Sequence, residues 1–290
     1  MIGRRIIHNG EPADPSAAVF PLDDLDVTYG YGCYETLKVR GGRLWFPEFH
    51  EERLLSSAAI LGIRHSFAAG SLAPAIRRLA ELNGIADCNV KVMLIGHEGR
   101  DADWYAFLLP APVVPPESYG EGVRCLAFRG QRHFPRAKSL SMLLSTVAYR
   151  EAARAGCHDA LLVNERGQLT EGTRTNLFWY RHDGSDRLFT PPACDVLEGV
   201  TRRTLLAALD EAGLAVEERP LSLDDARSGA CGLLVTGTSI DVLPVRALVD
   251  TDGAETALRI GPPAARVMAV YAAWLARRPA GDSMGVPAGG

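Results

Sequence analysis

The sequence predicts an α+β protein with two domains. Segments typical of strands and segments with helical periodicity are mixed along the chain without strict β-α-β alternation, which argues against a doubly wound parallel sheet. A stretch rich in proline and glycine, 110–122, interrupts these elements and is typical of a linker. The length of 290 residues is enough for two modest domains. We therefore expect a small N-terminal α/β domain over 1–116, a larger C-terminal domain over 117–278 and a disordered tail over 279–290.

The N-terminal part is predicted to contain five strands and two helices. The strands are expected at 4–8, 34–39, 43–46, 90–95 and 104–109. The first helix, 47–61, has proline in its first turn and repeats Leu54 and Leu61 on one face. The second helix, 71–82, ends near Gly84, because glycine readily adopts the left-handed conformation that closes a helix.

The C-terminal part is predicted to contain six strands and three helices. The strands are expected at 123–128, 159–163, 168–170, 175–180, 187–190 and 231–236. The helices are expected at 141–155, 200–212 and 262–277. Lys138 lies in a polar loop before the first of these helices.

Composition limits the class of function. The formal net charge is −4 and the pI is about 6.0, so the charge balance does not call for nucleic acid or an anionic membrane as a partner. The opening residues, MIGRRIIHNG, hold no apolar segment of the kind that a signal peptide needs. The apolar runs elsewhere are far shorter than a membrane span. We therefore expect a cytoplasmic protein.

The cysteines, histidines and glycines exclude several kinds of site. The six cysteines form no Cys-x-x-Cys pair, and the seven histidines show no metal-ligand spacing, so we expect no metal. No Gly-x-Gly-x-x-Gly motif opens a helix and no Walker-type loop is present. Dinucleotide binding and nucleoside triphosphate binding are therefore disfavoured.

Lysine usage is the sharpest feature of the composition. Of the 31 basic residues, only Lys38, Lys91 and Lys138 are lysines. Either basic residue can supply surface charge, but only a lysine amine can lose its proton and form a covalent bond to a carbonyl. Any covalent amine chemistry must therefore use one of these three residues.

Four further segments could bind a phosphate or a cofactor ring. Leu197–Arg202 stands at a predicted helix start, where free N–H groups bind anions. Thr236–Ser239 follows a strand and offers hydroxyl groups. Arg53 lies on the first predicted helix, and Glu171 lies at a strand end. Each is more often a cap, a turn or a solvated side chain when it occurs alone.

The order of these segments makes them informative together. They resemble the class IV aminotransferases, the fold-type IV enzymes that use pyridoxal 5′-phosphate (PLP). This family includes branched-chain and D-amino acid aminotransferases, (R)-amine transaminases and 4-amino-4-deoxychorismate lyase. The matching pieces are Tyr29-Gly30-Tyr31-Gly32-Cys33-Tyr34-Glu35-Thr36, His50-x-x-Arg53-Leu54 with Ser57-Ala58, Lys138-Ser139-Leu140, Glu171-Gly172-Thr173-x-x-Asn176-Leu177-Phe178, Thr190-Pro191-Pro192, Gly199-Val200-Thr201-Arg202, Thr236-Gly237-Thr238 and Pro244-Val245.

The resemblance implies a role for each matching residue. Lys138 would form the internal aldimine with PLP and then carry a proton between the substrate Cα and the cofactor. Glu171 would face the pyridine nitrogen and keep it protonated, and Leu197 would pack against the ring face. The phosphate would be held by Arg53, the N–H groups of Val200 and Thr201, and Thr238. The substrate side would be lined by Tyr34 and by the backbone near Ser239.

The resemblance also implies the fold and the partners. The expected fold is that of a fold-type IV PLP enzyme, with a small N-terminal α/β domain and a larger C-terminal PLP-binding domain built on a mixed, barrel-like sheet. The expected partners are an amino donor, a 2-oxo acid acceptor and a second copy of the chain in a homodimer.

Departures from the family pattern leave the substrate open. Tyr31 stands where relatives have aspartate, and Leu143 does not match the tyrosine of branched-chain aminotransferases. His97 stands where D-amino acid aminotransferases have a carboxylate-binding arginine, so that substrate site would be incomplete. Arg174 and Arg100 are alternative carboxylate anchors, and the role of Lys91 is left open.

Two activities therefore remain possible on this scaffold. The favoured one is an aminotransferase that moves an amino group between an amino acid, of the D-amino acid or branched-chain type, and a 2-oxo acid. The alternative is 4-amino-4-deoxychorismate lyase, which would use the same lysine to eliminate pyruvate. A non-catalytic homologue is disfavoured, because Lys138, Glu171 and the phosphate-binding residues are all present.

Overall fold

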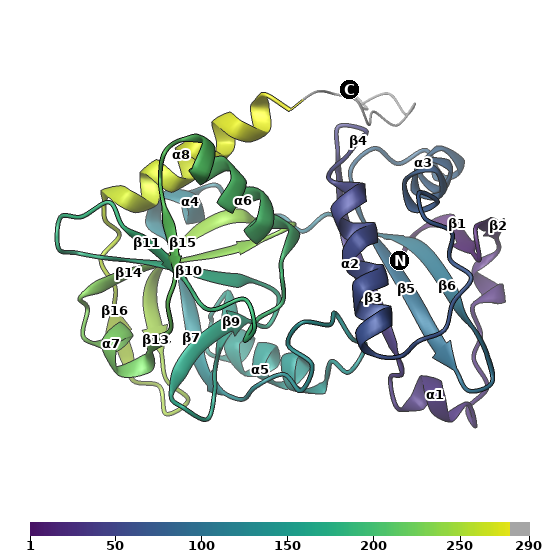
Figure 1. The fold of residues 1–290 in the computed structure, drawn as a ribbon, viewed down its shortest axis with the longest axis horizontal. Helices are drawn as coiled ribbons and strands as arrows, with labels where there is room; N and C mark the ends of the chain where they lie inside the picture. Colours follow the sequence, from purple (N-terminus) through teal and green to yellow (C-terminus); the bar gives the residue numbers. More distant parts are fainter. Residues whose placement is uncertain (279–290) are drawn as a thin grey trace. The chain divides into compact units, whose positions relative to one another are not determined.

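The computed structural model describes residues 1–278, and the predicted tail 279–290 lies outside the described residues. The described chain forms two compact units (Figure 1). The first unit contains residues 1–113 and the segment 137–142, and the second contains 114–136 and 143–278. Segment 137–142, which carries Lys138, thus groups with the N-terminal part of the chain, although the sequence analysis assigned it to 117–278.

The first unit is built on a six-stranded sheet in which every neighbouring pair is antiparallel. The strand order is β2-β1-β6-β5-β3-β4. The strands are β1 (Ile2–His8), β2 (Glu11–Ala13), β3 (Gly32–Arg40), β4 (Arg43–Leu44), β5 (Cys88–His97) and β6 (Arg100–Leu109). Two long helices, α2 (Pro47–Ile60) and α3 (Leu72–Asn83), confirm the predicted helices, and the short helices η1 (Pro15–Ala17) and α1 (Leu25–Thr28) precede β3.

Alternation along the strands gives this sheet two different faces. Leu37 of β3 and Val90 of β5 are fully buried in a large core with α2 and α3, which lie on the same face (Figure 1). The opposite face carries a smaller cluster that includes Ile95 and Tyr105, with Leu140 of segment 137–142 packed against it. Neighbouring residues of one strand therefore enter different environments.

The second unit contains a closed barrel of mixed strands. The strands β10-β14-β15-β7-β8-β9 pair in that order, and β9 pairs back with β10. The pairs β7–β8 and β7–β15 are parallel, and the other pairs of the barrel are antiparallel. The strands are β7 (Val123–Arg129), β8 (Asp159–Val163), β9 (Gln168–Gly172), β10 (Asn176–Arg181), β14 (Cys231–Gly237) and β15 (Asp241–Val249), with β11 (Leu188–Thr190), β12 (Val216–Glu218), β13 (Leu221–Ser222) and β16 (Glu255–Ala257) added at its margins. The predicted mixed, barrel-like sheet is confirmed.

Period-2 alternation also separates the inside of the barrel from the outside. Leu177 and Trp179 of β10 belong to the barrel core, whereas Tyr180 points outward and accepts a hydrogen bond from the Gly261 N–H at 2.8 Å. The outer surface carries α5 (Leu143–Arg154), α6 (Val200–Glu211) and α8 (Pro262–Ala276), whereas α4 (Glu117–Glu121) and α7 (Leu223–Arg227) pack against the barrel core, to which α7 contributes Leu223 and Ala226. Of these, α6 and α8 pack against each other and against β14.

The sequence analysis missed strand β15, which is central to the barrel. Pro244 lies within it, and a proline cannot donate to a strand ladder, so the run does not read as a central strand. In the structure, Pro244 pairs in register with Leu234 of β14, and pairing with β7 begins one residue later, at Val245. The N–H that Pro244 lacks would therefore lie directly before the first residue of β15 that pairs with β7.

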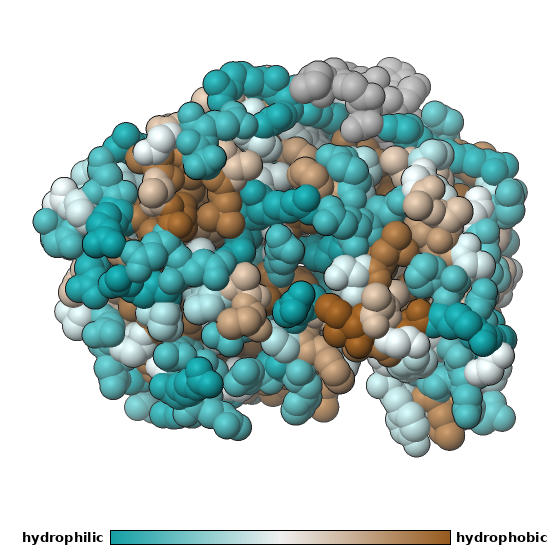
Figure 2. All heavy atoms as spheres, in the orientation of Figure 1, coloured by the Kyte–Doolittle hydropathy of each residue, from teal (hydrophilic) through white to brown (hydrophobic). Residues whose placement is uncertain are grey.

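Hydrophilic residues cover most of the face shown in Figure 2, and apolar residues form smaller patches. No helix within residues 1–278 is long and apolar enough to cross a membrane. The exposed apolar side chains in the first unit concentrate in one short segment, where Val19, Leu22, Leu25 and Tyr29 are each more than half exposed.

A buried carboxylate organises the turn between β9 and β10. Asp159, the first residue of β8, is fully buried and accepts hydrogen bonds from the hydroxyl groups of Thr173 and Thr175 and from the N–H of Ala160. A Cβ atom at Gly172 would lie 2.0 Å from Thr175 Oγ1 and 2.5 Å from Asp159 Oδ2, so only glycine fits there. One acid therefore fixes both ends of the turn.

We predict that Asp159→Asn destabilises the protein. The amide keeps the shape of the side chain but loses the charge, and hydrogen bonds to a charged acceptor contribute about 1.5–3 kcal/mol. The free energy of unfolding in urea should fall by about that amount. Asp252→Asn is the matched control, because Asp252 is exposed and accepts one hydrogen bond within a turn. Equal stabilities of the two variants would contradict the role given to Asp159.

Candidate active site

Lys138 is anchored to the first unit through its backbone. Its carbonyl oxygen accepts a hydrogen bond from the Tyr34 N–H at 2.9 Å, and its own N–H donates to Ser57 Oγ of α2 at 3.0 Å. The Leu140 N–H donates to the Gly32 carbonyl oxygen at 2.8 Å, so segment 137–142 continues the pairing along β3. The position of the Lys138 side chain is thus defined by a strand and a helix rather than by a free loop.

Tyr34 lies beside two of the three lysines. The Lys138 Nζ atom is 4.5 Å from the centroid of the Tyr34 ring, and the Lys91 Nζ atom is 3.3 Å from it. The Tyr34 hydroxyl donates to the Met142 sulfur at 3.3 Å. Tyr34 and Lys138, both predicted as site residues, are therefore neighbours in the structure.

Arg53 is held by a buried acid that the sequence analysis did not assign. Its Nε and Nη2 atoms donate to the two oxygens of Glu35, each at 2.7 Å, and His50 Nδ1 lies 2.7 Å from Glu35 Oε2. Burial alone would raise the pKa of Glu35, but the charge and hydrogen bonds of Arg53, with the hydrogen bond from His50, hold it at about 2. Burial lowers the pKa of His50 despite the nearby carboxylate, so a neutral His50 donates to an ionised Glu35.

His97, predicted to contact the substrate, lies among carboxylates. Its Nε2 atom is 3.1 Å from Asp103 Oδ2, and its Nδ1 atom is 3.9 Å from Asp24 Oδ2. Possible metal-ligand atoms of Asp24, Asp26 and His97 lie within 4.8 Å of one another. Asp24 and Asp26 also accept hydrogen bonds from the backbone. Asp24 caps α1 by accepting from the Val27 N–H, and Asp26 accepts from the Glu98 N–H.

Glu171 of β9 is buried and held from two sides in the second unit. Its Oε2 atom accepts a hydrogen bond from the Leu197 N–H at 3.1 Å, and its Oε1 atom accepts one from Arg132 Nη1 at 3.2 Å. A buried acid that accepts a hydrogen bond from a guanidinium is favoured in its ionised form. Glu171 can therefore present negative charge to a cationic group.

Leu197, predicted to pack on the cofactor ring, is fixed by a cross-strand pair. Glu171 and Asn176 face each other in the β9–β10 register. Glu171 accepts from the Leu197 N–H, and Asn176 Nδ2 donates to the Leu197 carbonyl oxygen at 2.8 Å. Asn176 Oδ1 also occupies the space where a Cβ atom of Gly199 would lie, which explains the glycine at that position.

The start of α6 offers donors that no side chain caps. Gly199 is the N-cap and makes no side-chain capping bond, so the first N–H groups, including those of Val200 and Thr201, remain available. Among the described residues, the buried hydroxyl of Thr236 also has no hydrogen-bond partner. Thr238 and Ser239 follow in the turn after β14, and that turn is supported by a hydrogen bond from the Tyr119 hydroxyl to the Ile240 carbonyl oxygen.

These groups fit the cofactor that the resemblance implies. A buried acid suits a protonated pyridine nitrogen, and free N–H groups with an unpartnered hydroxyl suit a phosphate. Two arginines of the same region have other partners. Arg174, predicted as a substrate anchor, lies over the Tyr149 ring at 3.8 Å, and the buried Arg202 donates to Glu218 at 2.9 Å.

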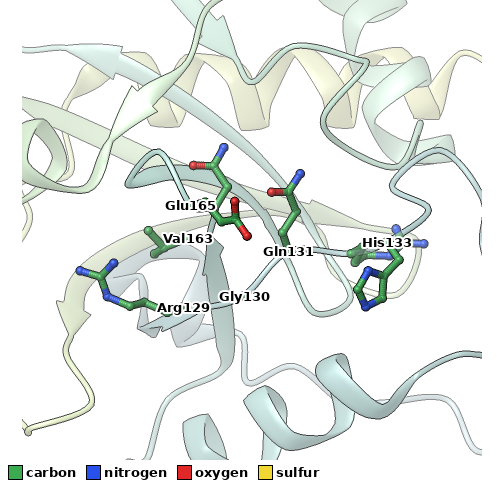
Figure 3. A pocket seen from close by; sticks show the side chains of 8 residues that line it. Arg129, Gly130, Gln131, His133, Val163 and Glu165 are labelled. Atoms are coloured by element: carbon green, nitrogen blue, oxygen red, sulfur yellow. The ribbon is translucent and has the colours of Figure 1, made fainter.

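The second unit also contains a pocket of 510 Å³ (Figure 3). It is formed by the segment after β7 and the turn after β8, and its lining residues are Arg129, Gly130, Gln131, Arg132, His133, Val163, Asn164 and Glu165. None of the residues predicted for the site lines it. Arg132 links this pocket to the predicted site residue Glu171, because it forms part of the pocket wall and donates a hydrogen bond to Glu171.

Sequence reasoning missed the residues that hold the predicted ones in place. Glu35, His50 and Asn176 occur in the quoted motifs but received no role, although the i, i+3 spacing of His50 and Arg53 on one helix face was visible. Asp159 carries no local pattern. Of the predicted residues, Tyr34, Arg53, His97 and Lys138 belong to the first unit, and Glu171, Arg174, Leu197, Val200, Thr201, Thr238 and Ser239 belong to the second.

Comparisons with known proteins indicate the family of the chain. The family model described as amino-transferase class IV matches residues 32–248. A D-alanine aminotransferase from Bacillus licheniformis is 27% identical, over 84% of this chain and 88% of the relative. A putative branched-chain-amino-acid aminotransferase from Methanocaldococcus jannaschii is also 27% identical, over 83% of this chain and 86% of the relative.

A solved structure shows that the fold is shared. A hypothetical aminotransferase from Mycobacterium tuberculosis, in its PLP-bound form, superposes with a TM-score of 0.76 over 94% of this chain and 100% of that chain, at 24% sequence identity. The family match covers most of the described chain and includes Lys138, Glu171 and the start of α6. The chain therefore belongs to the class IV aminotransferases, a family of PLP-dependent enzymes.

Proposed function

We propose that this enzyme moves an amino group between an amino acid and a 2-oxo acid, and that Lys138 is the residue that bonds the cofactor. The observation that supports Lys138 is its anchored backbone, with one hydrogen bond from β3 and one to α2. Of the other lysines, Lys38 lies near the Trp45 ring and Lys91 lies over the Tyr34 ring, and neither lies in a segment of the family motif.

PLP supplies an electron-withdrawing ring, which makes the Cα–H bond of a bound amino acid acidic. In our proposal the Lys138 amine takes up and returns the proton at the substrate Cα. Glu171 would pair with the charged pyridine nitrogen, and Arg132 holds the Glu171 carboxylate in place through a hydrogen bond. Leu197 would lie against the ring face, in the position set by the hydrogen bonds of its backbone to Glu171 and Asn176.

We assign the cofactor phosphate to Arg53, Thr238 and the first N–H groups of α6, those of Val200 and Thr201. The bidentate contact with Glu35 supports the role of Arg53, because it fixes the plane of the guanidinium. Tyr34 and Ser239 are assigned to the substrate side, with Arg174 and His97 as further contacts.

The substrate type rests on the relatives, among which are D-alanine and branched-chain aminotransferases. We therefore propose an amino donor of the D-amino acid or branched-chain type. We also propose that the enzyme works as a homodimer. The exposed apolar side chains of Val19, Leu22, Leu25 and Tyr29 support this, because such a patch favours contact with another protein surface.

We predict that Lys138→Ala abolishes the covalent attachment of PLP. Borohydride reduction followed by peptide mass spectrometry should find the cofactor on Lys138 in the wild-type enzyme and on no peptide of the variant. Lys38→Ala is the matched control and should keep the modification. A variant that still carries a reduced bond to the cofactor would show that another lysine forms it.

We predict that Glu171→Gln slows turnover while PLP stays bound. An opposite charge shifts a nearby pKa by roughly 1–3 units, so its loss should lower kcat about ten- to a thousandfold. The reaction with a good amino donor should be followed by stopped-flow absorbance. Glu165→Gln is the control, because Glu165 is exposed in the turn after β8. A wild-type rate in Glu171→Gln would place the charge partner of the ring on another acid.

The activity itself is tested by crossing a panel of amino donors with several 2-oxo acids. We expect a product amino acid to form only when both substrates are present, with D-alanine or a branched-chain amino acid among the best donors. The lyase alternative makes the opposite prediction. It releases pyruvate and an aromatic product from aminodeoxychorismate with no 2-oxo acid added.

A further inference from the structure

The pocket at the ends of β7 and β8 has walls that are fixed by hydrogen bonds. On one side, the Gly130 N–H donates to the Val163 carbonyl oxygen at 2.9 Å and joins the segment after β7 to β8. On the other side, Asn164 Oδ1 accepts from the N–H groups of Arg166 and Gln168 at 3.0 Å and 2.9 Å and closes the turn after β8. The volume of 510 Å³ lies in the range of pockets that bind small molecules. The pocket is therefore formed in the absence of a ligand.

Positive charge exceeds negative charge in the lining of this pocket. Arg129 and Arg132 each carry a permanent charge, and Glu165 is the one acid among the lining residues. Within residues 1–278, Glu165 forms no ion pair with either arginine, and the exposed Arg129 side chain forms none with any acid. The lining thus holds a cation that no carboxylate of the described chain neutralises.

Hydrogen-bond donors are distributed over the length of the pocket. Figure 3 shows the side chains of Arg129 and His133 at opposite ends of the lining, with Gln131 between them. A guanidinium, a side-chain amide and an imidazole all carry N–H donors. In the part of the chain that the structure describes, the side chains of Gln131 and His133 have no hydrogen-bond partner. A compact anion would meet donors at one end only, whereas an elongated anion with a carboxylate at each end would meet donors at both.

Arg132 belongs to the wall of this pocket and also contacts Glu171. Its Nη1 atom donates to Glu171 Oε1 and to the Pro135 carbonyl oxygen, each at 3.2 Å, and its Nη2 atom donates to the Phe134 carbonyl oxygen at 3.4 Å. These distances lie at or beyond the long end of the usual range for N–H donors, so the bonds are weak. A carboxylate in the pocket could therefore compete with Glu171 for this guanidinium.

We propose that the pocket binds a small dicarboxylate as an effector, and that this ligand competes with Glu171 for Arg132. Its carboxylates supply the acceptors that Arg129 and Arg132 are shaped to bind in pairs. Occupancy of the pocket then weakens the contact that holds Glu171. The inference goes beyond the proposed function, because binding in this pocket requires no reaction at Lys138.

Calorimetry with the PLP-loaded enzyme tests the site, with succinate as the probe and succinamide as its uncharged analogue. Succinate should bind to the wild type, and succinamide should not. Arg129→Met should weaken succinate binding about three- to tenfold, as expected for one exposed arginine–carboxylate pair. Arg166→Met is the matched control, because Arg166 is an exposed arginine of the neighbouring turn that does not line the pocket. Its succinate affinity should equal that of the wild type.

Glu171→Gln tests the competition for Arg132. Removal of the Glu171 charge frees the guanidinium for the ligand, so this variant should bind succinate about threefold more tightly than the wild type, since coupling between two binding partners is reciprocal. This readout is an affinity and not a rate, so it does not depend on the role of Glu171 in turnover. Equal succinate affinities of Glu171→Gln and the wild type would show that the two carboxylates do not compete.

The remaining outcomes decide where the probe binds and of what kind the ligand is. Equal loss of succinate affinity in Arg129→Met and Arg166→Met, or no loss in either, would place the bound succinate outside this pocket and overturn the site. Binding of inorganic phosphate without binding of succinate would overturn the choice of a dicarboxylate. The proposed function is tested separately, because the borohydride reaction at Lys138 is carried out with no succinate present.

Discussion

The fully buried carboxylate of Asp159 is the interaction on which the functional part of the second unit depends. It holds the threonine hydroxyl groups of the turn between β9 and β10, and that turn brings Glu171 and Asn176 into register. The same pair closes the barrel and forms hydrogen bonds with the N–H and the carbonyl oxygen of Leu197. Because α6 begins directly after this segment, one buried acid positions both the Glu171 carboxylate and the start of α6, the two groups that we propose for the pyridine nitrogen and the phosphate.

The first unit uses strand alternation to place two kinds of chemistry back to back. Glu35 faces α2, where it is buried with Arg53 and His50. Tyr34, its neighbour on β3, faces the other side with Lys91 and Lys138. The hydrogen-bonded Glu35–Arg53 ion pair therefore lies on one side of the sheet, and the side-chain amines of Lys91 and Lys138 lie on the other. Because the sheet separates the two groups, the Glu35 carboxylate forms its ion pair with Arg53 and not with either lysine.

Charge placement distinguishes groups that hold the structure from groups that are open to a ligand. Glu171 and Arg53 each have an opposite charge at hydrogen-bond distance, and this fixes their geometry in the absence of a ligand. The start of α6 and the Thr236 hydroxyl lack such partners among residues 1–278. Buried polar groups of this kind are costly in isolation, and binding of anionic groups compensates that cost.

The sequence by itself determined the main helices and the small set of lysines that could react, because helix periodicity, caps and composition are local features. Its ordered motifs indicated the family, and that resemblance implied the mixed barrel-like fold. The sequence did not determine which groups hold the site residues. The contacts that hold them join residues far apart in the chain. These contacts are the Arg132–Glu171 pair, the Glu35–Arg53 pair, the hydrogen bonds to Asp159 and the placement of three lysines on one face of the sheet. Only the tertiary structure decided these contacts, because strand register and barrel closure arise from long-range packing, and a register shift of one residue would turn each side chain to the opposite face.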